Sequence, residues 1–225
     1  MIRASLPPDV APKLLAGIDE QTVGLILGAA QRRQTPANQT ITTTGEKATQ
    51  LFLITGGRIR YYRPTKSGDE VLLGLLVPGD VFGLGSLLKC PTPYVGSAET
   101  ISECELFVWA DTCIRQLAQA HPQLAENSLH VVLHYLKAYV EKHVAIVTKP
   151  AAHRLADVLL DLAERVGQVA STGVEVDVTN EQLSSLAHIS PFTTSHLLTG
   201  WRRKGVVSKQ RHKVFLHAPE ALVFE

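Results

Sequence analysis

The sequence is poor in side chains that bind metals or form disulfides. Its 225 residues include three cysteines, Cys90, Cys104 and Cys113, none of them in the paired spacing of metal ligands. An odd number of cysteines without that spacing argues against a disulfide framework and a zinc knuckle. Residues 39–109 contain no histidine, so a cupin-type enzyme, which needs closely spaced metal-binding histidines, is a remote alternative. We expect no metal site, no resident cofactor and no catalytic residues.

The sequence also lacks a long apolar run. Its longest apolar stretch, Val71 to Val77, contains a glycine and is followed by Pro78, whereas a membrane-spanning helix needs roughly 18 residues. Pro7, Pro8 and Asp9 stand where a secretory signal would need a continuous apolar segment. These two absences predict a cytoplasmic protein with no membrane partner.

Charge is nearly balanced over the whole chain but not along it. Apolar residues make up 45% and charged residues 19%, a globular balance with a formal net charge of +1. Between Thr179 and Ala218, six basic residues stand against one acid, Glu181, so this segment has a net charge of +5. Such a patch attracts polyanions.

The first half of the sequence has glycine-containing turns at intervals near 11 residues, which is typical of all-β sandwiches and barrels. We predict a jelly-roll β-barrel between Gln39 and Trp109. Before it, the apolar residues from Val10 to Arg33 have helical spacing and predict a pair of packing helices. The predicted strands are Thr40 to Thr43, Leu51 to Thr55, Arg58 to Tyr62, Val71 to Leu76 and Cys104 to Val108.

From about Pro122 to Thr148 the apolar residues recur with a period near 3.5, which predicts one long helix with two apolar faces. One face can cover the barrel, and the other most simply meets its own copy across a two-fold axis, which predicts a homodimer. Pro150 disfavours the α conformation of Lys149, so the helix should end or bend there. The predicted dimer seam consists of Leu129, Val132, Leu136, Tyr139, His143 and Ile146.

The last third of the chain has the pattern of a helix-turn-helix followed by a β-wing. Thr179, with Gln182 three residues later, predicts a capping box that opens the first helix. Ser190 and Pro191 suit the N-cap and first position of the second helix, and Gly205 ends it. The predicted elements are helices Asn180 to Ala187 and Pro191 to about Lys204, and strands Val174 to Val178, Val206-Val207 and Val214 to Leu216.

In a helix-turn-helix the second helix enters the major groove, and basic side chains, hydroxyls and helix N-termini hold the phosphates. The +5 segment covers the end of that helix and the wing, which predicts binding to double-stranded DNA. Phe192 should point outward, where it either contacts thymine methyl groups or packs on the neighbouring helix. The predicted DNA-binding residues are Thr179, Asn180, Ser190, Pro191, Phe192, Thr193, Ser195, His196, Arg202, Lys209, Arg211 and Lys213.

These elements predict an α+β chain with a sensor barrel over residues 1–121, a dimerisation helix over 122–149 and a winged helix-turn-helix domain over 150–225. In this order they resemble the Crp/Fnr superfamily of bacterial transcription regulators. The matching stretches are Gly57-Arg58-Ile59-Arg60, Gly68-Asp69-Glu70, Pro78-Gly79-Asp80-Val81-Phe82-Gly83 and the block from Thr179 to Val207. The resemblance implies a cyclic-nucleotide-binding-like barrel and a homodimer that binds a roughly palindromic promoter site and works with RNA polymerase.

The sequence departs from the cyclic-nucleotide-binding members of the superfamily. Those members carry a glutamate just after the glycine of the phosphate cassette, and further on an arginine beside a small hydroxyl residue. The matching positions here are Leu84 after Gly83 and Gly96 before Ser97. A cyclic phosphate would lose its charged partner, so we expect weak or no binding of cyclic AMP.

The recognition helix departs from the superfamily as well. Members commonly present a glutamate and two arginines to the bases, whereas the matching positions here are Phe192, Pro191 and His196. We therefore expect a different preferred operator. In the cassette, the run Phe82 to Leu88 is closer to the global nitrogen regulator branch, but no effector arginine stands between Tyr94 and Thr100.

Two interpretations of the barrel interior stay open. A neutral or weakly charged effector binds there, or the same residues simply fill the barrel of a regulator that needs no effector. Iron–sulfur sensing is not expected without a cysteine before Cys90, and the dipeptide Cys90-Pro91 and the pair His130 and His134 are weak signals for haem and metal. The candidate pocket residues are Leu73, Leu75, Phe82, Gly83, Leu84, Gly85, Ser86, Ser97 and Tyr139.

Overall fold

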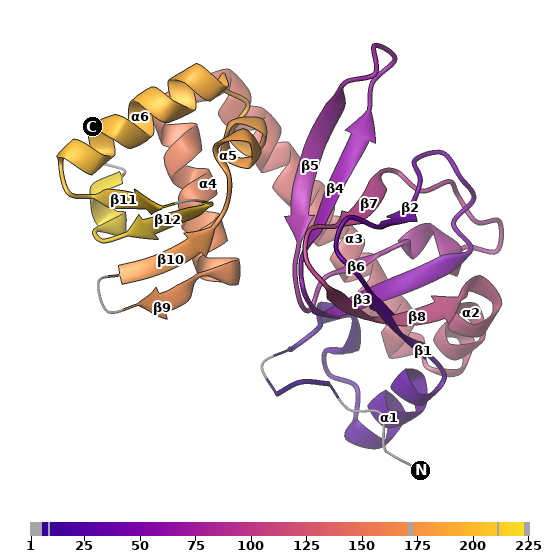
Figure 1. Cartoon of the computed structure of the whole chain (residues 1–225). Helices are drawn as coiled ribbons and strands as arrows, with labels where there is room; N and C mark the ends of the chain where they lie inside the picture. The colour runs from indigo at the N-terminus through magenta and orange to yellow at the C-terminus, as the bar shows by residue number, and fades with distance from the viewer. Residues whose placement is uncertain (1–5, 9, 171–172, 211, 223–225) are drawn as a thin grey trace. The chain divides into compact units, whose positions relative to one another are not determined.

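The computed structural model describes residues 6–8, 10–170, 173–210 and 212–222. The chain divides into two compact units, residues 1–138 and 139–225 (Figure 1). The division falls inside one long helix, α3 (Pro122–Thr148). No helix within the described ranges is both long and apolar enough to cross a membrane.

In its described residues, the first unit has two antiparallel sheets of four strands each. One has the order β1 (Gln31–Thr35), β8 (Cys104–Ala110), β3 (Gln50–Gly56) and β6 (Val81–Phe82). The other has the order β2 (Thr40–Thr42), β7 (Ser97–Thr100), β4 (Ile59–Pro64) and β5 (Glu70–Leu76). Side chains of both sheets share one apolar core, which confirms the predicted β-rich N-terminal domain.

Helices pack on the sheet that contains β3. They are η1 (Lys13–Leu15), α1 (Glu20–Gly28), η2 (Leu84–Leu87), α2 (Asp111–Ala120) and the first turns of α3. The fully buried Trp109 donates from its indole nitrogen to the carbonyl of Ile26 over 2.8 Å. On α3, Val131 is buried in this second core and the Tyr135 hydroxyl donates to the carbonyl of Val81 over 2.9 Å. One face of the long helix therefore covers the barrel, as predicted.

The prediction of a helix pair from Val10 to Arg33 is wrong for the last residues of that range. The helix α1 ends at Gly28, and Gln31–Thr35 pair with β8 as an edge strand. Four of these five residues are exposed, so the strand has no alternating apolar pattern. The strand forms because its backbone pairs with β8, and such pairing does not require a periodic pattern of apolar residues in the sequence.

The second unit combines helices with a four-stranded antiparallel sheet. Its helices are α4 (Ala151–Val166), α5 (Asn180–Ala187), α6 (Pro191–Arg203) and η3 (Pro219–Leu222). The sheet has the order β11 (Val207–Gln210), β12 (Lys213–Leu216), β10 (Gly173–Asp177) and β9 (Gln168–Ala170). The predicted helix-turn-helix and wing are confirmed, and the strand β9 is an addition.

Candidate nucleic-acid interface and barrel interior

Local capping sets the geometry of the helix-turn-helix. The Thr179 hydroxyl accepts from the Gln182 N–H, and the Gln182 side chain accepts from the Thr179 N–H, which is the predicted capping box. His188 ends α5 in the left-handed conformation with φ 51°, which lets the chain turn sharply toward α6. Ser190 then caps α6 by accepting from the Thr193 N–H, with Pro191 in the first turn.

The helix α6 has a buried face and an exposed face. Thr194, Leu198 and Trp201 are buried against the rest of the second unit. Phe192 is 82% exposed, so the interpretation that it packs on the neighbouring helix is wrong. The structure confirms the predicted outward set, and its exposed members are Pro191, Phe192, Ser195 and His196.

Several predicted DNA-binding hydroxyls have partners within the fold. The Thr179 hydroxyl caps α5, and the hydroxyls of Ser190 and Thr193 lie 2.8 Å apart in a hydrogen bond. Asn180 accepts from the Lys209 ammonium over 2.6 Å, which links the first helix of the motif to the wing. Their contact with DNA stays a prediction.

The predicted basic residues differ in their surroundings. Arg202 and Lys209 are exposed, and Arg211 lies outside the described residues. Lys213 forms an ion pair with Glu175, and this hydrogen bond raises the pKa of Lys213. No sequence pattern indicated this pair, because the pairing of β10 with β12 brings the two residues together across 38 positions of the chain.

Arg154 on α4 is a structural residue that sequence reasoning did not single out. Its guanidinium donates to the carbonyls of Ala187 and His188 over 3.0 and 3.1 Å, at the end of α5. It also donates to the carbonyls of Lys149 and Ile146 over 3.0 and 3.3 Å, at the end of α3. One signal was available in the sequence. Arg154 lies near the start of its helix, where the helix dipole disfavours a basic residue unless that residue donates to acceptors elsewhere.

The candidate pocket residues of the barrel mostly belong to its packing. Leu75 and Phe82 are buried, and the Phe82 ring stacks on that of Phe52 with centroids 4.6 Å apart. Leu84 packs against the core beneath the helices. Gly83 has φ 83°, and a Cβ there would lie 2.3 Å from the Gln50 carbonyl oxygen.

The remaining candidate pocket residues differ in their burial and in their contacts. Ser86 is fully buried, and its hydroxyl has no hydrogen-bond partner among the described residues. Leu73 is half-buried, and a Cβ added at Gly85 would lie 2.4 Å from the Thr92 hydroxyl. Tyr139 belongs to the second compact unit and is 65% exposed. Its place in a pocket stays a prediction.

The resemblance assigns Gly96 and Ser97 to the positions beside a cyclic phosphate, and in the structure both contact other residues of the chain. The Tyr61 ring packs over Gly96, where a Cβ would lie 2.7 Å from the ring carbon Cζ. Burial raises the pKa of Tyr61, in keeping with a place inside the barrel. The Ser97 hydroxyl accepts from the Thr44 N–H over 3.0 Å and shares a hydrogen bond with the Thr44 hydroxyl over 3.1 Å. The position matching the acid of the cassette is Leu84, and weak or absent binding of cyclic AMP stays a prediction.

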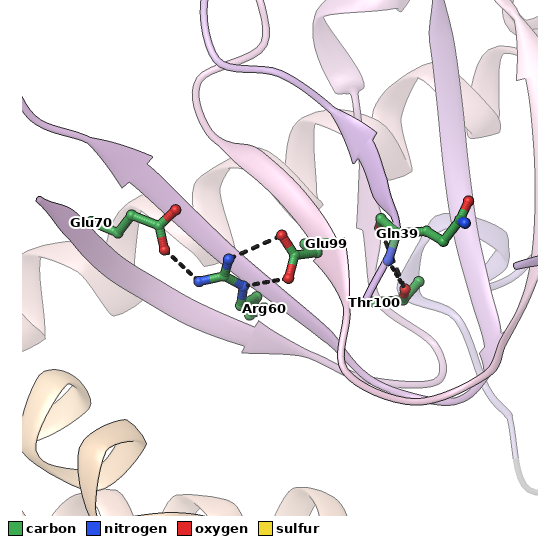
Figure 2. Close-up of polar contacts among 5 residues, drawn as sticks. All are labelled: Gln39, Arg60, Glu70, Glu99 and Thr100. Carbon is green, nitrogen blue, oxygen red and sulfur yellow. Dashed lines mark hydrogen bonds and ion pairs between the residues drawn. The ribbon is translucent and has the colours of Figure 1, made fainter. Parts of the chain in front are cut away.

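Arg60, the second arginine of the stretch Gly57 to Arg60, forms ion pairs within the barrel domain. Figure 2 shows the Arg60 guanidinium between the carboxylates of Glu99 and Glu70, with donor–acceptor distances of 3.0 and 2.9 Å to Glu99 and 2.5 Å to Glu70. The hydrogen bonds to Glu99 raise the pKa of Arg60. Ile59 and Tyr61 point into the core, so strand alternation places Arg60 on the outer face of the sheet. It ties β4, β5 and β7 together and is no partner for an anion inside the barrel.

Two family models match the chain. The cyclic nucleotide-binding domain matches residues 32–121, and the Crp-like helix-turn-helix domain matches residues 153–223. Together they cover the barrel and the winged helix-turn-helix.

Curated relatives match along most of their length. A CRP-like cAMP-activated global transcriptional regulator of Mycobacterium tuberculosis is 25% identical over 211 residues, which is 93% of this chain and 94% of the relative. The cyclic AMP receptor protein of Thermus thermophilus is 28% identical over 194 residues, covering 86% and 87%. Among solved structures, the c-di-GMP responsive regulator CLP of Xanthomonas campestris superposes with a TM-score of 0.76 at 19% identity, covering 88% and 99%. That last likeness concerns the fold alone.

Proposed function

The chain belongs to the Crp/Fnr superfamily of transcription regulators, and we propose that it acts in the cytoplasm as a homodimer that binds a specific site on double-stranded DNA. The observation that carries the proposal is the outward face of α6, where Phe192 and His196 are exposed beyond a capped helix N-terminus. Arg202 and Lys209 add positive charge beside this face. Such a helix suits the major groove, because its side chains reach base edges while its flanks hold phosphates.

The proposed homodimer is supported by a row of exposed, mostly apolar side chains on α3. All six residues of the predicted seam are exposed, namely Leu129, Val132, Leu136, Tyr139, His143 and Ile146. A second copy would bury them by knobs-into-holes packing. Two-fold pairing would then set two α6 helices on neighbouring major grooves roughly 34 Å apart, and the bound dimer would meet RNA polymerase at the promoter.

Two variants of the wing test DNA binding. Lys209→Ala is expected to reduce the slope of log affinity against log salt by about 0.9 for each phosphate that the protein no longer neutralises, because Lys209 is exposed and its hydrogen-bond partner Asn180 carries no charge. The matched control is Lys213→Ala on the next strand. Lys213 is neutralised by Glu175, so this variant should change the slope less. The readout is fluorescence anisotropy of a labelled duplex over a range of salt concentrations, and an unchanged slope in Lys209→Ala would remove Lys209 from the interface.

We propose further that cyclic AMP is not the effector of this chain. Isothermal titration calorimetry should detect no saturable binding, since the Tyr61 ring covers Gly96 and the Ser97 hydroxyl is bonded to Thr44. Grafting the charged pair as Leu84→Glu with Gly96→Arg should not restore binding, because the new arginine would collide with Tyr61. Only a triple variant that also carries Tyr61→Ala has room for it. Saturable binding by the unaltered chain would contradict the proposal.

The barrel core favours a regulator that needs no effector inside the barrel. Besides the stacked Phe52 and Phe82, the Tyr94 ring is buried in this core and its hydroxyl bonds to the backbone of Gln50 over 3.2 and 3.3 Å. A core packed with such aromatic side chains supports this interpretation.

A further inference from the structure

The exposed side chains of α6 form a stripe whose two ends differ in chemistry. Phe192, Ser195 and His196 are exposed and lie within four positions of one another, so they share one face of the helix. Arg202 and Arg203 are exposed too, but they belong to the last turn of α6. The stripe therefore begins with an aromatic ring and ends with positive charge.

The start of α6 lacks the side chains that most often read purines. Guanine is commonly read by arginine or lysine, and adenine by asparagine or glutamine. None of these residue types occurs from Pro191 to Leu198. The Thr193 hydroxyl is hydrogen-bonded to that of Ser190, which leaves Ser195 and His196 as the exposed polar side chains of these turns. Readout at the start of the helix must therefore include contacts of another kind.

Phe192 differs from other exposed apolar residues by its place in the fold. A single apolar side chain on a surface needs no ligand. Phe192, however, is the second residue of α6, and the first residues of a recognition helix are the ones that reach base edges in the major groove. The ring is 82% exposed and has no hydrogen-bonding atom, so the partner that suits it there is an apolar group of a base.

The helix holds the ring of Phe192 in a defined position. Thr194, Leu198 and Trp201 are buried and fix α6 in the second unit. The cap of Ser190 fixes the start of the helix. The phenylalanine side chain has only two rotatable bonds, so it loses little conformational entropy when it makes a contact. A side chain on such a rigid element can discriminate between groups that differ by one methyl.

We propose that Phe192 reads a thymine in each half-site of the operator by packing its ring against the C5-methyl group in the major groove. The inference rests on the proposed DNA function and goes beyond it, because it names the base and the group that are read. The thymine methyl is the apolar group that base pairs display in this groove, and phenylalanine is among the residues that contact it.

The experiment starts from the site that the full chain selects from random-sequence duplexes. Each thymine of that site is replaced in turn by deoxyuridine, at the same place in both half-sites, which removes the methyl group and keeps the base pairing. Anisotropy of the labelled duplex measures the affinity. For at least one thymine, loss of the buried methyl should weaken binding about fourfold per half-site, hence about 15-fold for the symmetric change.

Two protein variants assign the methyl contact to Phe192. Phe192→Ala should bind the thymine and uracil duplexes with equal affinity, whereas Phe192→Leu keeps an apolar side chain and should retain part of the difference. The matched control is Leu25→Ala on α1, which removes a side chain that is 58% exposed in the first unit; it should keep the full difference. Circular dichroism checks that all three variants are folded.

A second pair of duplexes moves the methyl group to another base. Cytosine in place of the contacted thymine should weaken binding, and 5-methylcytosine in the same place should recover about fourfold per half-site, because it presents a methyl at the same carbon. Phe192→Ala should show no recovery. A recovery of the same size in Phe192→Ala would assign the methyl contact to another side chain and overturn the proposal.

The remaining outcomes separate this inference from the proposed function. If the unaltered chain selects a site but binds its thymine and uracil forms equally, the methyl readout is wrong while sequence-specific binding stands. If Phe192→Ala weakens binding to the selected site and to random duplexes by the same factor, Phe192 makes a contact that does not depend on sequence. If Phe192→Ala changes no affinity, the ring serves a contact with another protein. A chain that binds no duplex even at low salt would refute the proposed function itself.

Discussion

Replacing Leu136 by aspartate is expected to give a monomer whose affinity for a palindromic operator is lower by about 100-fold or more. Leu136 lies near the middle of the seam on α3 and is 54% exposed in the single chain. An aspartate there costs the isolated chain little, because its carboxylate stays in water. In a dimer two such carboxylates would face each other in an apolar interface, where unpaired charge is strongly unfavourable.

The affinity drops because the two helix-turn-helix domains are no longer joined in one molecule. When one helix-turn-helix of a dimer has bound, the second binds its half-site as if at a local concentration near the millimolar range, which multiplies affinity by about 10² to 10⁴. A monomer loses this factor entirely. Sedimentation velocity measures the mass, and anisotropy with a palindromic duplex measures the affinity.

The control for this prediction is Lys137→Asp, which places the same carboxylate on the neighbouring residue outside the seam. It should leave the mass unchanged. A Leu136→Asp variant that still sediments as a dimer would mean that the subunits meet elsewhere, and a monomer with undiminished operator affinity would refute the two-headed mode of binding.

Replacing Arg154 by methionine is expected to lower the unfolding free energy of the second unit by about 2 to 4 kcal/mol. The guanidinium donates to four carbonyls, two at the end of α3 and two at the end of α5. Carbonyls at helix ends have no partner inside their own helix. Methionine keeps much of the aliphatic volume but none of the donors, so these acceptors must turn to water.

The matched control is Arg165→Met on the same helix, where the Arg165 guanidinium lies 3.7 Å from the carboxylate of Asp161 four residues earlier. Surface pairs of this kind contribute about 0.5 kcal/mol or less. Urea unfolding followed by Trp201 fluorescence should therefore shift much further for Arg154→Met than for Arg165→Met. Equal shifts of the two unfolding curves would mean that Arg154 contributes no more to stability than an ordinary surface charge.

The features of the DNA-binding unit that sequence alone predicted are local ones. The capping box of Thr179 with Gln182 and the cap of Ser190 with Thr193 join residues three positions apart, so the sequence contains both partners side by side. The outward direction of Phe192 follows from the helical period in the same way. The two faces of α3 were also predictable, since periodic spacing records which residues share a face.

The tertiary structure decided what depends on strand register and on side chains that reach across it. The strand β1 exists because its backbone pairs with β8, and Lys213 meets Glu175 because β12 lies beside β10. The Tyr61 ring covers Gly96 only because β4 pairs with β7. Such partners lie tens of residues apart, and which of them meet is set by how the sheets close on a shared core. The sequence by itself therefore determined the plan of a barrel, a long helix and a helix-turn-helix with its wing, while the folded chain decided which strands pair and which side chains meet across them.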